Sequence, residues 1–297
     1  MKYGMFYGYW KRDWSGDYLP LVSRAKKCGF DILAVSSGYL VEKTEAELDA
    51  LRREAEEWEV ELHAGFGPGP DCNLASQDQA VVDHAFRYYG RIFQVLERLG
   101  IPYLGGNHYS CAPQALPLPI DKEGDRERLL ARMDRLAGQA GDCGITLMME
   151  VVCRYEGYLI NTAEEGVAFL KELGKENVRL ILDTFHMNIE EDSFSAAIHT
   201  AGKALGYFHT GECNRKLPGA GRIPWNEIRH ALRQIHFDGP VTMEPFILPG
   251  GSIGNELGVW RDLSGGASEQ EMDQMASESL KFMKYVLEGE GFLPEIL

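Results

Sequence analysis

Residues 146–150 read TLMME, an apolar run that ends in an ionisable residue, and the same form recurs three times further along the chain. RLILD occupies 179–183, GYFH 206–209 and VTME 241–244. Short apolar runs of this kind are typical of buried strands in a parallel sheet. Their final residues are 33, 26 and 35 positions apart, which is the length of about one strand–helix unit of ~30 residues. We therefore expect four consecutive parallel strands that end at the same side of a sheet.

The same alternation of a β-rich run and a longer amphipathic segment extends back to the N-terminus. Hydroxyl residues with an acid or amide three positions later predict capping boxes at Thr44, Ser76 and Thr162. No linker or low-complexity tract divides the chain. The sequence predicts an α/β fold with residues 1–297 as one (β/α)₈ barrel domain. The eight expected strands are 3–7, 32–35, 60–64, 103–104, 146–150, 179–183, 206–209 and 241–244.

Composition excludes several classes of protein. The chain is 44% hydrophobic and 25% charged, as globular domains are, and its net charge of -15 opposes binding to nucleic acid or to anionic lipid. No segment reaches the ~18 consecutive apolar residues of a membrane span. Six scattered cysteines without a CxxC pair favour free thiols in the cytoplasm. We expect a cytoplasmic protein that acts on a small molecule.

The last residues of the four C-terminal runs are Glu150, Asp183, His209 and Glu244. A polar residue at one strand end means only that the chain leaves the core. Four ionisable groups on four neighbouring strands, three of them acidic, would repel one another without a cation between them. Three carboxylates and an imidazole suit one Mn²⁺, Mg²⁺ or Co²⁺ ion, and zinc stays an alternative.

Two of these acids are also candidates for proton transfer. Strands five and eight lie three steps apart in an eight-strand ring, so Glu150 and Glu244 should approach a central ligand from directions roughly 135° apart. Inversion of a carbon beside a carbonyl requires a base on one face and an acid on the other. A divalent ion would stabilise the enediolate between the two steps.

A second layer of polar and aromatic residues follows the strands. His186 and Arg215 are candidates to bind sugar oxygens, whereas Arg154, Glu156 and Glu212 fit either that role or a salt-bridge network at the rim. Apolar walls could come from Phe6, Trp10 and Phe246, although core packing is equally common for such residues.

At these positions the sequence resembles the ketose 3-epimerases, the D-tagatose 3-epimerase and D-psicose (D-allulose) 3-epimerase group of the xylose-isomerase-like barrels. The resemblance covers nearly the whole chain. Its most specific segments are MFYGYW at 5–10, MEVVCRYE at 149–156, LDTFHMNIEEDSF at 182–194, FHTGECNR at 208–215, GAGRIPWNEI at 219–228, MEPF at 243–246 and VWRDLSGGA at 259–267.

The resemblance implies a function and a site. It implies epimerisation of free ketoses at carbon 3, of the D-fructose/D-psicose or D-tagatose/D-sorbose type, by a homodimer or homotetramer that binds Mn²⁺ or Co²⁺. Glu150, Asp183, His209 and Glu244 would bind the metal, and Glu150 and Glu244 would be the acid/base pair. Glu156, His186 and Arg215 would hold the sugar oxygens.

Three positions bear on sugar preference. Phe6 matches the tagatose branch, where the psicose branch often has Tyr. Ala112 stands where relatives carry a Trp that covers the far end of the sugar, and Cys153 replaces a usual Asn. Loss of that indole should enlarge or open the pocket beyond the reactive carbons.

Several alternatives share the barrel. An aldose–ketose or hydroxypyruvate-type isomerase and an inosose-type dehydratase also begin by removing a proton beside a carbonyl. A multi-zinc phosphodiesterase would need more strand-end histidines, and a non-catalytic sugar-binding barrel would need no opposed acids. The Gly-rich stretch 249–258 falls where barrels often bind phosphate, but it contains no Lys or Arg, so a free ketose is preferred over a phosphorylated one.

Overall fold

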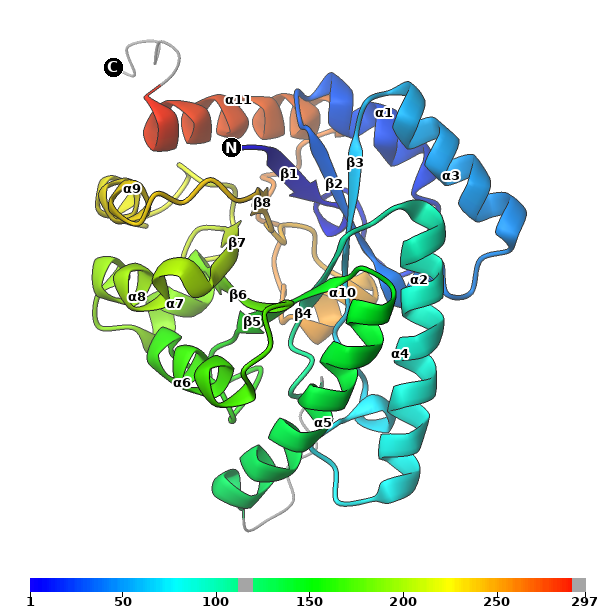
Figure 1. Cartoon of the computed structure of the whole chain (residues 1–297). Helices are drawn as coiled ribbons and strands as arrows, with labels where there is room; N and C mark the ends of the chain where they lie inside the picture. Colours follow the sequence, from blue (N-terminus) through cyan, green and yellow to red (C-terminus); the bar gives the residue numbers. More distant parts are fainter. Residues whose placement is uncertain (112–119, 290–297) are drawn as a thin grey trace.

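The strands form a closed parallel barrel in which each pairs with the next along the chain and β8 pairs with β1 (Figure 1). The computed structural model describes residues 1–111 and 120–289. The strands are β1 (Tyr3–Phe6), β2 (Ile32–Ser36), β3 (Glu61–Gly65), β4 (Tyr103–Gly106), β5 (Thr146–Val151), β6 (Val178–Asp183), β7 (Leu205–Thr210) and β8 (Val241–Met243). The family's expected fold, a (β/α)₈ barrel, is confirmed.

Helices surround the barrel, and their buried stripes pack on the outward faces of the strands (Figure 1). The α-helices are α1 (Leu19–Lys27), α2 (Ser37–Leu40), α3 (Glu45–Glu57), α4 (Gln79–Leu99), α5 (Lys122–Asp142), α6 (Ala163–Leu173), α7 (Thr184–Glu190), α8 (Phe194–Ala201), α9 (Trp225–Gln234), α10 (Gly251–Glu256) and α11 (Glu269–Glu288). Short 3₁₀ turns are η1 (Tyr7–Tyr9), η2 (Pro70–Cys72) and η3 (Gly202–Ala204). The N-terminal amine pairs with Glu288 at 3.0 Å, which fastens the start of β1 to α11.

The expected strand boundaries agree with the structure to within two residues, and the caps agree less evenly. Thr44 forms the predicted reciprocal capping box with Glu47. Thr162 caps α6, but the Glu165 carboxylate accepts from the N–H of Asn161. The prediction at Ser76 is wrong. The N-cap of α4 is Asp78, whose carboxylate accepts from the N–H of Ala80 at 2.8 Å, because α4 begins only at Gln79.

Strand register determines which side chains meet at the mouth of the barrel. Asp183 pairs with His209 across β6 and β7, and the N–H of Glu244 donates to the carbonyl of Thr210 at 2.9 Å. The β6–β7 register shifts at Leu180/Ile181, an irregularity of the kind that often lies next to active sites. Below the mouth the barrel interior is filled by Met148, Ile181 and Tyr207 with Tyr103.

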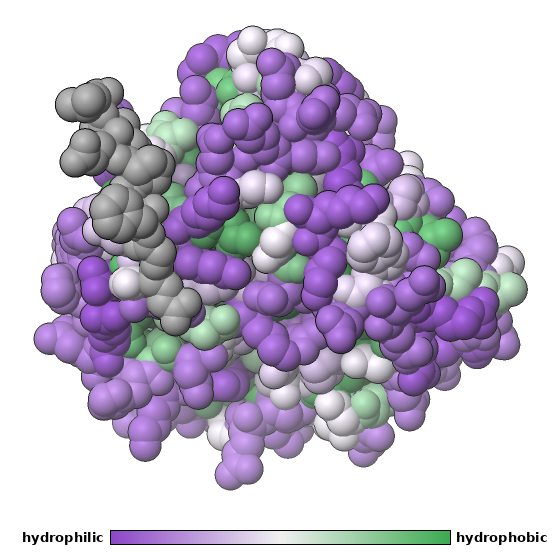
Figure 2. All heavy atoms as spheres, turned by 90° about the horizontal axis from the view of Figure 1, so that it is seen from above, coloured by the Kyte–Doolittle hydropathy of each residue, from purple (hydrophilic) through white to green (hydrophobic). Residues whose placement is uncertain are grey.

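The surface is polar, as the charge balance leads one to expect. The face in Figure 2 is covered mainly by hydrophilic residues, with small apolar areas between them. No helix within residues 1–111 and 120–289 has the length and apolar character needed to cross a bilayer. The six cysteines, all inside these ranges, are free thiols.

Candidate active site

The four strand-end residues converge at the mouth of the barrel. Glu150, Asp183, His209 and Glu244 each offer a ligand atom, and these atoms all lie within 4.8 Å of one another. His209 Nδ1 lies 3.1 Å from Glu150 Oε1 and 3.9 Å from Glu244 Oε2. Asp183 is fully buried, and Glu244 follows the last residue of β8. The four form a candidate metal-binding group.

The charges of these groups depend strongly on one another. Burial and the nearby charge of Glu150 raise the pKa of Glu244 to about 8. Burial would also raise the pKa of Glu150, but the positive charges of His209, His186 and Arg215 lower it to about 2. Burial opposes the charged form of His209, yet the carboxylate of Glu150 raises its pKa to about 9. Protons on Glu244 and His209 therefore reduce the repulsion among the carboxylates, and a divalent cation that displaced these protons would take over that role.

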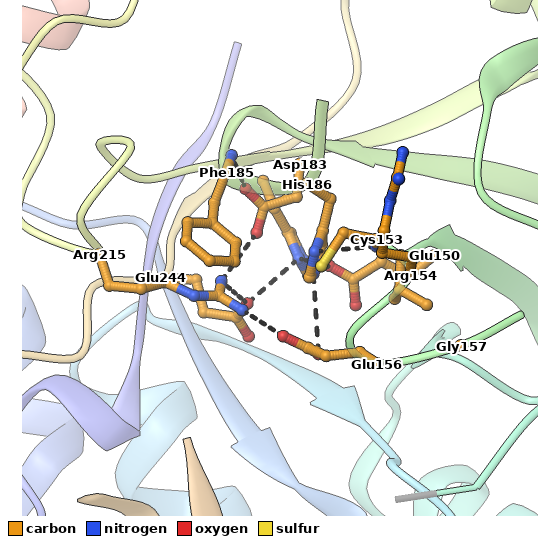
Figure 3. A network of polar contacts seen from close by, with 12 residues as sticks. Glu150, Cys153, Arg154, Glu156, Gly157, Asp183, Phe185, His186, Arg215 and Glu244 are labelled. Carbon is orange, nitrogen blue, oxygen red and sulfur yellow. Dashed lines mark hydrogen bonds and ion pairs between the residues drawn. The ribbon is translucent and has the colours of Figure 1, made fainter. Parts of the chain in front are cut away.

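Arg215 and Glu156 extend this group into a wider network (Figure 3). The guanidinium of Arg215 lies 2.9 Å from Glu156 Oε1, 3.4 Å from Asp183 Oδ2 and 3.7 Å from Glu244 Oε2. The buried guanidinium of Arg215 therefore joins Glu156 to two of the strand-end carboxylates.

The position of Arg215 depends on its backbone and on two aromatic rings. Its φ of 61° is left-handed, a conformation that a non-glycine residue rarely adopts. Its guanidinium lies 3.8 Å from the ring centroid of Phe185 and 5.3 Å from that of Phe246. Cation–π contacts at these distances hold the charged head over the carboxylates. Phe185 was not among the residues predicted from sequence, although it lies between Asp183 and His186.

His186 is buried beside the carboxylates, on the first turns of α7. Its Nδ1 accepts from the backbone N–H of Cys153 at 3.2 Å. The proton of the neutral ring therefore belongs on Nε2, which lies 4.0 Å from Glu150 and 3.8 Å from Glu156. Cys153 thus positions His186 through its backbone N–H. A Cys in place of the expected Asn therefore leaves this hydrogen bond possible. Ala112, the other departure, lies outside the described residues.

The network forms one side of a cavity of about 570 Å³. Phe6 and Phe246 line it as expected, with their ring centroids 5.8 Å apart, and Trp14 packs against both. The opposite side includes several small neutral residues, among them Ser36, Gly65 and Gly106, and it also includes the acid Glu42. A volume of this size is within the ~300–1,000 Å³ typical of small-molecule sites.

Three second-layer residues do not face the cavity. Trp10, considered as a wall, instead donates from Nε1 to Asp273 on α11 at 2.9 Å. Arg154 forms a two-point ion pair with Glu190, with both distances 2.8 Å, and points away from the network in Figure 3. Glu212 is fully buried and accepts from Gly219, Ile223 and Trp225, so its role is to shape the loop after β7.

His63 lines the cavity, although no pattern in the sequence predicted it there. Its Nδ1 is 2.8 Å from the hydroxyl of Tyr207, and that hydroxyl is 2.7 Å from Thr242 Oγ1. Burial lowers the pKa of His63, which keeps the ring neutral. Three strands thus share a buried polar chain beneath the carboxylates.

Comparison with known proteins agrees with this geometry. A family model described as xylose isomerase-like TIM barrel matches residues 22–284. The chain is 46% identical over 289 residues to D-psicose 3-epimerase of Agrobacterium fabrum, covering 97% of this chain and 100% of that protein. A crystal structure of D-psicose 3-epimerase in the presence of D-fructose superposes with a TM-score of 0.94 at 46% identity, covering 97% and 99% of the two chains.

A second crystal structure, D-psicose 3-epimerase with D-tagatose from Clostridium cellulolyticum, also gives a TM-score of 0.94, at 44% identity over 97% and 99% of the chains. Similarity of this extent covers the barrel, its strand-end residues and the loops around the cavity. The chain therefore belongs to the ketose 3-epimerase family of the xylose isomerase-like TIM barrels.

Proposed function

We propose that this protein is an isomerase that epimerises free ketoses at carbon 3, of the D-fructose/D-psicose or D-tagatose/D-sorbose type. The observation that carries the proposal is the convergence of Glu150 and Glu244 with Asp183 and His209 at one side of a sugar-sized cavity. The activity named for the full-length relatives is the same.

One divalent ion per subunit, Mn²⁺ with Co²⁺ or Mg²⁺ as alternatives, completes the site. Three carboxylates and one imidazole without a thiolate are a donor set that such ions prefer. When bound, the ion supplies positive charge that stabilises negative charge developing on the sugar's oxygens. Glu150, Asp183, His209 and Glu244 are the residues that would hold it.

Glu150 and Glu244 exchange the proton at carbon 3. They come from β5 and the end of β8, three steps apart in the ring, so they approach a central sugar from different directions. One carboxylate removes the proton and leaves an enediolate, and the other carboxyl donates a proton to the opposite face. In the reverse reaction the two residues exchange roles.

Glu156, His186 and Arg215 bind the sugar oxygens near the reacting carbon. Nε2 of His186 can donate to an oxygen, and Arg215 offers charge-assisted hydrogen bonds from a position held by two rings. Phe6 and Phe246 supply apolar contact for the C–H faces of the sugar.

The proposal includes the wider organisation of the protein. Residues 1–297 act as one catalytic domain, in a homodimer or homotetramer located in the cytoplasm. Six free cysteines support the location, and the net charge of -15 argues against nucleic acid as a partner. Analytical ultracentrifugation measures the oligomeric state directly.

The decisive experiment is incubation of the manganese-loaded protein with free ketohexoses and ketopentoses in D₂O. An epimerase exchanges the hydrogen at carbon 3 and yields the 3-epimer, seen by chromatography and by NMR. Label at carbon 1 or 2 with an aldose product would instead identify an isomerase, and loss of water would identify a dehydratase. Inactivity toward every ketose, with the metal verified, would reject the proposal.

A further inference from the structure

A second group of ligand-type side chains lies outside the catalytic cavity. Asp71 and Cys72 belong to η2, in the segment between β3 and α4, and His84 is on α4. Their ligand atoms all lie within 4.8 Å of one another. None of the three is among the residues that line the cavity.

The arrangement is open to solvent on one side and buried on the other. The side chains of Asp71 and His84 are 77% and 45% exposed, whereas Cys72 is only 4% exposed. His84 Nε2 and Asp71 Oδ2 are 3.7 Å apart, which is too long for a hydrogen bond. An ion can therefore enter from solvent, contact the thiol below, and draw together two side chains that are not hydrogen-bonded to each other.

The donor chemistry differs from that of the catalytic group. A thiolate, an imidazole and a carboxylate form a borderline-soft set that zinc prefers, while the catalytic group has no sulfur. Tetrahedral zinc with bonds of ~2.0–2.3 Å holds its ligand atoms roughly 3.3–3.8 Å apart. The three atoms need to approach by about 1.5 Å at most, and the exposed Asp71 side chain can make part of that adjustment.

We infer that Asp71, Cys72 and His84 form a second divalent-metal site, selective for zinc-like ions, on the outer side of the cavity wall. Water would occupy the remaining position of the ion.

The site is connected to the cavity by a stack of rings. His84 stacks on Tyr88 at 6.1 Å, and Tyr88 stacks on Phe66 at 5.5 Å. Phe66, Gly67 and Gly69 line the cavity and precede η2 directly. An ion that joins η2 to α4 therefore restrains this side of the cavity wall. A third group, Cys153 with Glu156 and His186, also contains a thiol, but it belongs to the catalytic network already described.

Cobalt titration of the manganese-loaded protein tests the inference by a signal that the catalytic group cannot give. Co²⁺ bound to a thiolate has a charge-transfer absorption in the near ultraviolet, and the catalytic ligands contain no thiolate. We expect this band to saturate at one equivalent per chain in the unaltered protein and in Cys153→Ser. It should be lost in Cys72→Ser. A band that persists in Cys72→Ser and disappears in Cys153→Ser would show that the thiolate ligand is Cys153 in the cavity, which would overturn the inference. The absence of any band would also overturn it.

Zinc binding provides a second readout that does not depend on removing a buried thiol. His84→Ala alters a half-exposed side chain, and we expect it to weaken zinc binding to the second site by at least about tenfold. Cys143→Ser is the control. Cys143 is partly buried, and it belongs to none of the three ligand groups found among the described residues. Equal zinc affinity in His84→Ala and the unaltered protein would refute the site. Epimerase activity with Mn²⁺ should survive in Cys72→Ser, His84→Ala and Cys143→Ser, so this test stands apart from the proposed function.

Discussion

The two halves of the barrel mouth border one cavity but differ in chemistry. Strands β5 to β8 present Glu150, Asp183, His209 and Glu244, whereas β1 to β4 end in Phe6, Ser36, Gly65 and Gly106. Strands β5 to β8 concentrate charged side chains and candidate metal ligands, whereas β1 to β4 end mainly in small or apolar residues that leave room. From this difference we expect the reaction and the choice of sugar to depend on different strands, so substitutions in the two halves should affect different kinetic constants.

The largest expected effect of a substitution is that of Glu244→Gln, with Glu150→Gln as its counterpart. Either amide removes one member of the proton-transfer pair, and kcat should fall by about 10²–10⁴-fold while circular dichroism shows an intact fold. Glu42→Gln is the matched control, because Glu42 lines the opposite half of the cavity and pairs with Arg91 at 3.6 Å. It should change kcat by less than about twofold. Similar losses in both halves would break the comparison.

Removal of the metal should abolish activity, because the candidate ligands all belong to the half formed by β5 to β8, and addition of Mn²⁺ should restore the activity. Before the metal binds, the pKa of His209 is raised to about 9 and that of Glu244 to about 8, so both groups hold protons that a cation must displace. Affinity for Mn²⁺ should therefore rise with pH up to about 8–9, by about tenfold per unit for each proton released. Calorimetry in two buffers of different ionisation enthalpy measures the proton release. Affinity that does not change with pH would contradict this.

Arg215→Lys tests whether the guanidinium is required rather than its charge. Lysine keeps the charge but loses the planar contacts with Phe185 and Glu156, so kcat/KM should fall by about 10–100-fold. Arg154→Lys is the control, since that side chain pairs with Glu190 outside the cavity and should leave kcat/KM nearly unchanged. Equal effects would remove Arg215 from the sugar contacts.

Glycines at the ends of β3 and β4 test the half of the barrel mouth that lies opposite the charged strands. A Cβ at Gly65 would meet nothing within 4 Å, so Gly65→Ala should fold normally, yet it reduces the room for the sugar. We expect kcat/KM for ketohexoses to fall by about tenfold, through KM more than through kcat. At Gly106 a Cβ would clash with the Phe66 carbonyl, and φ is 124°, so Gly106→Ala should lower the unfolding free energy by more than about 1 kcal/mol. If Gly65→Ala lowered only kcat and left KM unchanged, loss of room for the sugar would not explain the effect.

Phe6→Tyr should have the smallest effect. The ring packs against Phe246 and Trp14 at the cavity wall, and a hydroxyl there changes the surface offered to the far part of the sugar. The ratio of kcat/KM for D-fructose and D-tagatose should shift by less than about tenfold, with kcat for each sugar nearly constant. A large fall in kcat would place Phe6 in the reaction rather than in sugar choice.

The ionisable residues at the ends of β5 to β8 were predictable, because each follows directly from the position where an apolar run ends. An apolar run that closes on Glu150 or Asp183 marks both the strand and its carboxyl end, and parallel strands bring such ends to one side of a barrel. Helix starts were less predictable, as Ser76 shows. There a nearby aspartate, Asp78, provides the cap, and spacing alone does not distinguish the two.

The sequence by itself determined the barrel, the four strand-end residues and the opposed pair Glu150 and Glu244, because periodicity and spacing are local properties that repeat in every strand–helix unit. Tertiary structure alone decided how Phe185 holds Arg215, why Glu212 is a loop support, and why His63 lies beneath the site. It also brought Cys72 to His84. Each of these depends on contacts between segments whose separation along the chain carries no periodic signal, so only packing of the closed barrel determines them.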